Sequence, residues 1–278
     1  MSDRPSAPEP LAVPVADSHC HLDMCATEGG PSPEESLKAA RAVGVTKVIQ
    51  VGCDVDGSRW AANFAAQEPD VWACVAVHPN EAPRIHRDGG LDLIEAAWGE
   101  IAGLAELPQV RAVGETGMDF YRTPPEGRAI QEESFRKHIE IAKGVGKPLV
   151  VHDRDSHADV LRIVDDEGAP ESVVLHCFSG DADFASAAVE RGWYCSFSGV
   201  VTFKNAQPLR DALAVVPDEL VLVETDAPFL TPMPHRGKLN GPNLIPLTVR
   251  AMAQVRNIGE DELSANLMAN TERVFGPL

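Results

Sequence analysis

The chain has 278 residues, of which 44% are hydrophobic, so it is long enough for one large α/β domain or two smaller ones with a substantial core. Its formal net charge of −18 argues against a broad basic surface for nucleic acid. The charge does not exclude a nucleic-acid substrate held in a local pocket, because bound cations change the local electric field. No segment approaches the ~20 apolar residues of a membrane span.

Residues 1–10 are rich in Pro, Ser and acidic side chains and lack the basic and apolar regions of a signal peptide. We expect a disordered leader over residues 1–10 and a single domain over residues 11–278. The six cysteines are scattered without C-x-x-C spacing, and several lie in apolar runs. This pattern is typical of core thiols in a reducing compartment, so we predict a cytoplasmic protein.

Strand-like and helix-like runs alternate along the chain. The predicted strands cover residues 13–17, 47–52, 72–77, 110–114, 148–152, 172–176, 193–197 and 220–224. The predicted helices cover 33–43, 58–67, 91–107, 128–143, 156–167, 182–191 and 208–215, followed by two closing helices at 245–255 and 260–275. Eight buried strands alternating with helices predict a closed, parallel (β/α)8 barrel of the TIM type; an open doubly wound sheet is the alternative. The longest loops are expected after Val77 and Glu224.

Polar side chains collect where the predicted strands end. His19 and His21 follow the first strand, and side chains two residues apart on a strand point to the same side. Further strand ends carry His78, Glu115, His152, His176 and Asp226. In a parallel barrel all of these ends meet at one face, where the chemistry of such folds is found.

This set predicts a site for two divalent metal ions. We expect His19, His21 and Asp226 to complete one ion, with His152 and His176 completing the other. Glu115, from the fourth strand, would bridge ions ~3.5–4 Å apart. Each residue taken alone is more typical of a hydrogen-bonded core histidine or a salt-bridged carboxylate, but burying so many polar groups at one face without a cation is costly.

Three of the four remaining histidines are assigned differently. His86, His138 and His157 fall in helices or loops and are expected to be solvated surface residues.

Several motifs resemble those of the TatD-type metal-dependent hydrolases (TatD family DNases), a branch of the amidohydrolase superfamily. The matching segments are residues 19–23 (HCHLD), 114–122 (GETGMDFYR), 176–180 (HCFSG), 224–230 (ETDAPFL), 236–240 (RGKLN) and the N-T-x-R-x-F ending at 270–275. The resemblance implies a (β/α)8 barrel and divalent-metal-dependent phosphodiester hydrolysis with DNA as the usual substrate. It also implies metal-ligand roles for the six residues assigned above: His19, His21, Glu115, His152, His176 and Asp226. The chain departs from the family's Gly-x-His-Pro-His pattern: it keeps His78, a candidate substrate contact, but has Asn80 in place of the second histidine.

The expected activity is that of a 3′–5′ deoxyribonuclease acting on DNA ends or single strands, through attack by a metal-activated hydroxide with two Zn, Mg or Mn ions. Asp226 is expected to act as general base, together with Glu115 as a second catalytic carboxylate, and Glu224 is a candidate for orienting a ligand. Arg154, Lys204 and Arg236 are candidate phosphate contacts. The acidic composition favours ends or short strands over long duplex DNA.

Two other classes of function stay open. One is a metal-dependent hydrolase of a small phosphoester or of an ester or amide such as an aminoacyl ester. Many amidohydrolases use a carboxylated lysine between their metals, and this chain offers Glu115 there instead. The other is a binding protein with a vestigial site, against which the complete ligand set argues. No membrane or obligatory protein partner is expected.

Overall fold

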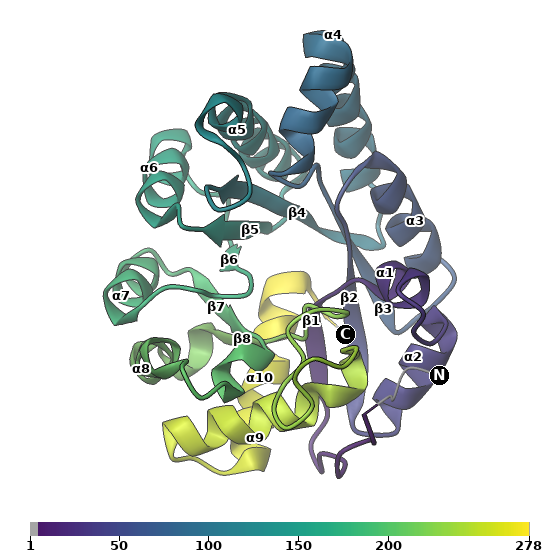
Figure 1. Cartoon of the computed structure of the whole chain (residues 1–278), viewed down its shortest axis with the longest axis vertical. Helices are drawn as coiled ribbons and strands as arrows, with labels where there is room; N and C mark the ends of the chain where they lie inside the picture. The colour runs from purple at the N-terminus through teal and green to yellow at the C-terminus, as the bar shows by residue number, and fades with distance from the viewer. Residues whose placement is uncertain (1–4, 278) are drawn as a thin grey trace. The chain divides into compact units, whose positions relative to one another are not determined.

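The computed structural model describes residues 5–277, so the first four residues of the predicted leader lie outside it. Figure 1 colours the chain by residue number. The chain divides into two compact units. Unit 1 contains Met1–Gln50 and Gly180–Leu278, and unit 2 contains Val51–Ser179. Within the described residues, eight strands alternate with helices, and their order in the sheet follows the chain from β1 to β8.

Unit 1 carries the first and last elements of the chain. Its strands are β1 (Val15–Cys20), β2 (Val45–Gly52, which runs on into unit 2), β7 (Tyr194–Phe197) and β8 (Val221–Val223). Its helices are α1 (Leu22–Thr27), α2 (Pro33–Arg41), α7 (Ala182–Glu190), α8 (Gln207–Val215), α9 (Ile245–Arg256) and α10 (Glu260–Phe275). Short 3₁₀ turns lie at Gly199–Thr202, Asp218–Leu220 and Pro242–Leu244.

Unit 2 carries the middle of the chain. Its strands are β3 (Val71–Val75), β4 (Val110–Asp119), β5 (Leu149–Arg154) and β6 (Val173–Leu175). Its helices are α3 (Val55–Ala65), α4 (Glu81–Ala105), α5 (Arg128–Val145) and α6 (His157–Glu167), and a 3₁₀ turn lies at Pro125–Gly127.

The elements form for reasons visible in the sequence. Strands β1, β3, β6, β7 and β8 are buried along their whole length, as parallel strands covered on both faces are. Helix α2 begins with a capping box, in which Ser32 and Glu35 satisfy each other's backbone N–H, and Pro33 fits its first turn. Helix α5 ends at Gly146 in the left-handed conformation. No helix within residues 5–277 is long and apolar enough to cross a membrane.

The loop predicted after Val77 is wrong. Only His78, Pro79 and Asn80 separate the strand region from α4, which starts at Glu81 and not at residue 91. The helix is interrupted at Gly90, whose φ is 69°, so the predicted start marks the second half of a broken helix. The first half of α4 was not predicted because it contains Pro83, although proline is tolerated in the first turn of a helix.

Strand β4 is longer than predicted and continues from Gly114 to Asp119. Its pairing with β5 resumes after an irregularity between Val113 and Thr116, so that Gly117 lies opposite His152. A Cβ added to Gly117, whose φ is +139°, would lie 2.1 Å from the carbonyl oxygen of His152. The predicted strand ended at the first glycine, Gly114. The second glycine, Gly117, instead lets β4 continue in close contact with β5, because it has no side chain.

We expect Gly117→Ala to destabilise the protein by at least about 2 kcal/mol, because the new methyl group meets backbone rather than a flexible side chain. Urea unfolding of the variant measures this. Gly144→Ala on α5 is the matched control: a Cβ there meets nothing within 4 Å, and alanine favours the helix by about 0.5–1 kcal/mol. Equal stability of the two variants would contradict the close approach.

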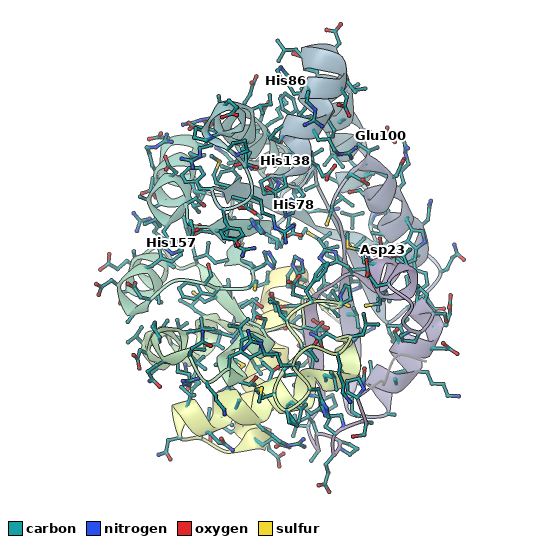
Figure 2. The ribbon with its side chains drawn as sticks, viewed as in Figure 1. Asp23, His78, His86, Glu100, His138 and His157 are labelled. Atoms are coloured by element: carbon teal, nitrogen blue, oxygen red, sulfur yellow. The ribbon has the colours of Figure 1, made fainter. Side chains whose placement is uncertain are left out.

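The prediction that His138 is a solvated surface residue is wrong, whereas His86 and His157 are half-exposed (Figure 2). His138 is fully buried on α5; its Nδ1–H donates to the Ser134 carbonyl at 2.6 Å, and its Nε2 accepts from Val77 N–H at 3.0 Å. Both ring nitrogens are thus used by the neutral imidazole. Burial lowers the pKa of His138 from 6.5 to about 4, against the opposing effect of the Ser134 hydrogen bond.

This burial predicts a pH-dependent stability. Between pH 6.5 and 4 the unfolded chain binds a proton at His138 that the folded protein excludes, so stability is present above pH 6.5 and lost as the pH falls toward 4. The loss amounts to about 3 kcal/mol for this one group. His138→Gln can keep both hydrogen bonds without titrating, so its unfolding free energy should fall less between pH 7 and pH 4 than that of the wild type. His86→Gln is the control, and an unchanged pH slope in His138→Gln would refute the assignment.

Candidate functional site

The first cluster of metal-ligand side chains lies in unit 1 and consists of His19, His21 and Asp226. The chain after β8 runs beside the end of β1: Asp226 N–H donates to the His19 carbonyl at 3.0 Å, and His21 N–H donates to the Ala227 carbonyl at 2.9 Å. This short parallel ladder brings Asp226 Oδ1 to 3.6 Å from His21 Nε2 and 4.0 Å from His19 Nε2. We call this group the unit 1 cluster.

Asp17 and Thr225 fix the backbone of this cluster. The fully buried Asp17 carboxylate accepts from Thr225 N–H at 2.9 Å and from Thr225 Oγ1 at 2.5 Å. Burial raises the pKa of Asp17 to about 7, although the bonds from Thr225 act in the opposite direction. Asp226 itself has φ 54°, a left-handed conformation that is sparsely populated except by Gly, Asn and Asp. Asp226 is thus held in this conformation by the backbone segments on either side of it.

The second cluster lies in unit 2 and surrounds the buried carboxylate of Glu115. His176 Nε2 lies 2.7 Å from Glu115 Oε2, and His152 Nδ1 lies 3.2 Å from the same oxygen. His78 Nε2 lies 3.8 Å from the other oxygen, Oε1. We call these four residues the unit 2 cluster. The sequence predicts that all four lie at strand ends; this is right for His78 and His176, which follow β3 and β6, but Glu115 and His152 lie inside β4 and β5.

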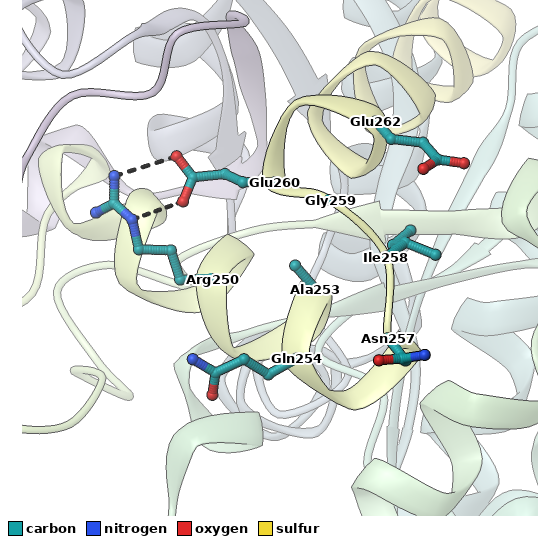
Figure 3. A pocket seen from close by; sticks show the side chains of 8 residues that line it. All are labelled: Arg250, Ala253, Gln254, Asn257, Ile258, Gly259, Glu260 and Glu262. Atoms are coloured by element: carbon teal, nitrogen blue, oxygen red, sulfur yellow. Dashed lines mark hydrogen bonds and ion pairs between the residues drawn. The ribbon is translucent and has the colours of Figure 1, made fainter.

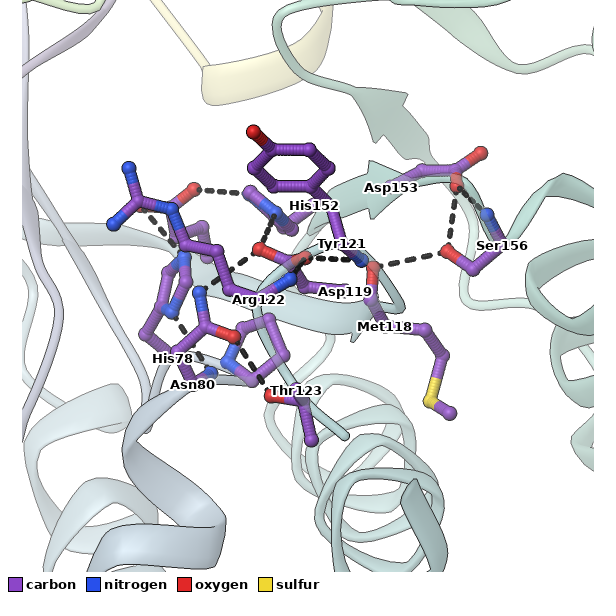
Figure 4. A network of polar contacts seen from close by, with 12 residues as sticks. His78, Asn80, Met118, Asp119, Tyr121, Arg122, Thr123, His152, Asp153 and Ser156 are labelled. Carbon is purple, nitrogen blue, oxygen red and sulfur yellow. Dashed lines mark hydrogen bonds and ion pairs between the residues drawn. The ribbon is translucent and has the colours of Figure 1, made fainter. Parts of the chain in front are cut away.

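Asp119 was not identified from the sequence as a site residue, yet it supports the unit 2 cluster (Figure 4). Its Oδ2 lies 3.3 Å from His152 Nε2 and accepts from Asn80 Nδ2 at 2.9 Å. Its Oδ1 accepts from the backbone N–H groups of Tyr121 and Arg122. A carboxylate on the far nitrogen of a ligand histidine is the usual way of fixing its orientation. Its position at the end of β4, within the 114–122 motif, was the available signal.

The electrostatics of the unit 2 cluster favour positive charge. Burial opposes ionisation of Asp119, but its hydrogen bonds with His152 and Asn80 outweigh this and hold its pKa well below the usual range. Burial likewise disfavours a charged His152, yet the contacts with Asp119 and Glu115 raise its pKa. Two carboxylates facing imidazoles thus attract a cation to this place.

Cys53 is a second residue that sequence reasoning missed. Its Sγ donates to Glu115 Oε1 at 3.6 Å, and its carbonyl accepts from His78 N–H at 2.8 Å. It directly follows β2, so its strand-end position could have marked it. All six cysteines are thiols without a disulfide in the structure.

Both clusters fit a divalent metal ion by the chemistry of their donors. In the unit 1 cluster, one ligand atom from each of the three residues lies within 4.8 Å of the others, and the same holds for His78, Glu115 and His152 in the unit 2 cluster. Mixed imidazole and carboxylate donors suit Zn, Mn or Fe. His78, predicted as a substrate contact, thus lies among the ligand candidates.

The predicted phosphate contacts lie in different settings. The guanidinium of Arg154 lies 4.0 Å from the centre of the Tyr121 ring, two residues beyond His152 on β5. Arg236 is exposed and lies over the Phe203 ring at 4.4 Å. Lys204 is exposed in the loop after the first 3₁₀ turn of unit 1. Their contacts with substrate stay predictions.

A hollow of about 790 Å³ lies between α9 and α10 of unit 1 (Figure 3). Arg250 and Glu260 line it and form an ion pair at 2.7 Å. Arg250 also donates to the Glu9 carbonyl at 2.8 Å. No cluster residue lines this hollow, so it is not part of the candidate metal centre.

Comparison with known proteins agrees with this arrangement. The family model for TatD-related DNases matches residues 16–276. The chain is 42% identical over 266 residues to an uncharacterized metal-dependent hydrolase, TatD, of Mycobacterium tuberculosis, covering 94% of this chain and 98% of that protein. It is 36% identical over 263 residues to the uncharacterized metal-dependent hydrolase YcfH of Escherichia coli K12, covering 94% and 95%.

The fold gives the same answer. The crystal structure of YJJV, a TatD homologue from Escherichia coli K12, superposes with a TM-score of 0.84 and 25% identity over 95% of this chain and 98% of that one. Together with eight strands and helices alternating in chain order, this match confirms the predicted (β/α)8 barrel class. By its match to the family model over residues 16–276 and its identity to metal-dependent hydrolases, the chain belongs to the TatD-related DNase family of metal-dependent hydrolases.

Proposed function

We propose that the protein is a metal-dependent phosphodiesterase, a 3′–5′ deoxyribonuclease that acts on DNA ends or single strands. The observation that carries the proposal is the buried Glu115 carboxylate with imidazoles on both of its oxygens. The second support is the unit 1 cluster, which has an imidazole–carboxylate donor set of its own. Membership of a family of metal-dependent hydrolases makes hydrolysis the expected chemistry of such donors.

The proposal assigns two divalent ions of the Zn, Mg or Mn kind. His19, His21 and Asp226 would hold one, and Glu115, His152 and His176, with His78 beside them, would hold the other. When bound, such ions supply Lewis-acid activation of water and offset the negative charge that grows on a phosphoryl group during hydrolysis.

The chain's own residues then have distinct tasks. Asp226, which is 16% exposed and fixed through its backbone, is assigned the role of general base that accepts a proton from the attacking water. Asp119 keeps the His152 ring in one orientation through its contact with Nε2. Arg154, Lys204 and Arg236 are assigned to substrate phosphates, where a guanidinium binds two oxygens at once.

The negative net charge of the chain favours short or single-stranded DNA over long duplex DNA as the substrate. A protein that grips long duplex DNA non-specifically makes many cationic phosphate contacts. With 42 acidic against 24 basic residues, this chain is suited to strand ends and short single strands.

A turnover panel tests the function. Metal-loaded protein should shorten a 5′-labelled single-stranded oligonucleotide from its 3′ end and should hydrolyse a nitrophenyl phosphodiester, but leave an aminoacyl ester intact. Cleavage of the aminoacyl ester alone would replace the phosphodiesterase assignment with that of a carboxylic ester hydrolase. Shortening from the 5′ end would retain the nuclease and reject the polarity.

A further inference from the structure

We propose that Tyr121, backed by Arg154, is a stacking platform for a nucleobase of the substrate next to the unit 2 cluster. Tyr121 is 66% exposed, so most of a large aromatic surface is left open to solvent. The Arg154 guanidinium covers the ring at 4.0 Å from its centre. A cation on one ring face leaves the other for a planar ligand.

The position of Tyr121 is fixed by a cluster-supporting carboxylate. One oxygen of Asp119 contacts His152 Nε2 at 3.3 Å, and the other accepts from Tyr121 N–H at 3.0 Å. On the other side, Phe120 N–H donates to the Arg154 carbonyl at 2.9 Å. Figure 4 shows the Tyr121 ring projecting from this network. The residue that orients a ligand histidine therefore also sets the backbone that carries the exposed ring.

Within residues 5–277, the exposed Tyr and Phe side chains lie close in sequence to acidic residues of the two clusters or beside them. Among residues 5–277 the large hydrophobic side chains that are exposed are Leu91, Leu93, Leu107, Tyr121, Val215 and Phe229. Of these, only Tyr121 and Phe229 are aromatic. Tyr121 comes two residues after Asp119, and Phe229 comes three residues after Asp226. In unit 1, Phe229 is 51% exposed, and its N–H donates to the Asp226 carbonyl at 2.9 Å. Asn240 Nδ2 donates to the Phe229 carbonyl at 2.6 Å, so this segment is also fixed.

The chemistry of the ligand follows from the pair of side chains. An open aromatic face binds any base through stacking, whatever its sequence identity. The N–H edge of a stacked guanidinium remains available to a phosphate oxygen. Tyr121 and Arg154 together therefore suit a nucleotide of a single strand, whose bases are unpaired, and not a small phosphoester without a base. This inference rests on the proposed phosphodiesterase function and names its substrate as single-stranded DNA.

The test separates stacking from catalysis. The probe is a single-stranded decanucleotide with 2-aminopurine as its 3′-terminal base and a methylphosphonate as its last linkage, which slows cleavage. Binding to metal-loaded protein should quench the 2-aminopurine fluorescence. Tyr121→Ala should weaken binding about tenfold and remove most of the quenching, while Tyr121→Phe keeps both. Leu91→Ala, which alters another exposed side chain of unit 2, on α4, should change neither.

Turnover measurements distinguish the stacking role of Tyr121 from the proposed nuclease function. On a cleavable oligonucleotide, Tyr121→Ala should raise KM about tenfold with little change in kcat, and an abasic 3′ nucleotide should abolish the difference from the wild type. A Tyr121→Ala enzyme with wild-type KM, affinity and quenching would overturn the platform and leave the nuclease intact. A wild-type protein that neither binds the probe nor cleaves the oligonucleotide would overturn the proposed function and the platform with it.

Discussion

Asp226→Asn should lower kcat by about 10²–10⁴-fold, the usual contribution of a positioned general base. Asparagine has nearly the same size and shape but cannot accept a proton. It also tolerates the left-handed conformation that Asp226 adopts at φ 54°, so the fold should survive. The backbone N–H of the residue still donates to the His19 carbonyl. Steady-state kinetics on a nitrophenyl phosphodiester measure the loss, and urea unfolding checks the fold.

The control for this variant is Asp211→Asn, which makes the same chemical change at an exposed site on α8 of unit 1. It should leave kcat unchanged. An Asp226→Asn enzyme that turns over at the wild-type rate would remove Asp226 from the mechanism.

Glu115→Gln should lower the affinity of the unit 2 cluster for Zn or Mn by more than about 100-fold. Loss of a residue that merely orients a ligand already costs 10–100-fold, and Glu115 is itself the shared partner of three imidazoles. The amide removes the negative charge and directs N–H groups toward nitrogens that would otherwise face a carboxylate. Isothermal titration of metal into the stripped protein measures the affinity.

Glu133→Gln is the matched control, because it removes an exposed carboxylate from α5 of the same unit. Its metal affinity should equal that of the wild type. If Glu115→Gln bound metal as tightly as the control, Glu115 would not be a ligand.

The sequence predicted the elements that carry the site because buried strands read as apolar runs and their polar ends stand out. His152 and His176 lie where β5 and β6 place them, beside Glu115. The first strand region was predicted two to three residues early: β1 runs to Cys20 and includes His19, and only His21 lies beyond it. The prediction that His19 and His21 point to the same side agrees with the structure, in which the centres of their rings lie 5.1 Å apart.

Other features escaped the sequence for physical reasons. Whether a histidine on an amphipathic helix faces core or solvent depends on its partners, and His138 is buried because Val77 N–H and the Ser134 carbonyl satisfy its ring. Asp119 and Cys53 have strand-end positions that the sequence could have marked, but their roles depend on contacts with His152 and Glu115, which lie far along the chain. The predicted leader over residues 1–10 and the roles of the phosphate-binding candidates stay predictions.

The most direct test of the central claim, that these side chains hold divalent cations for phosphodiester hydrolysis, is a metal-depletion experiment. The protein is stripped with a chelator, its metal content is measured by atomic emission, and single-stranded DNA hydrolysis is followed as Zn, Mg or Mn is added back. We predict no hydrolysis by the stripped protein and a return of activity that saturates at two bound ions per chain. Full activity in protein shown to be free of metal would contradict the account.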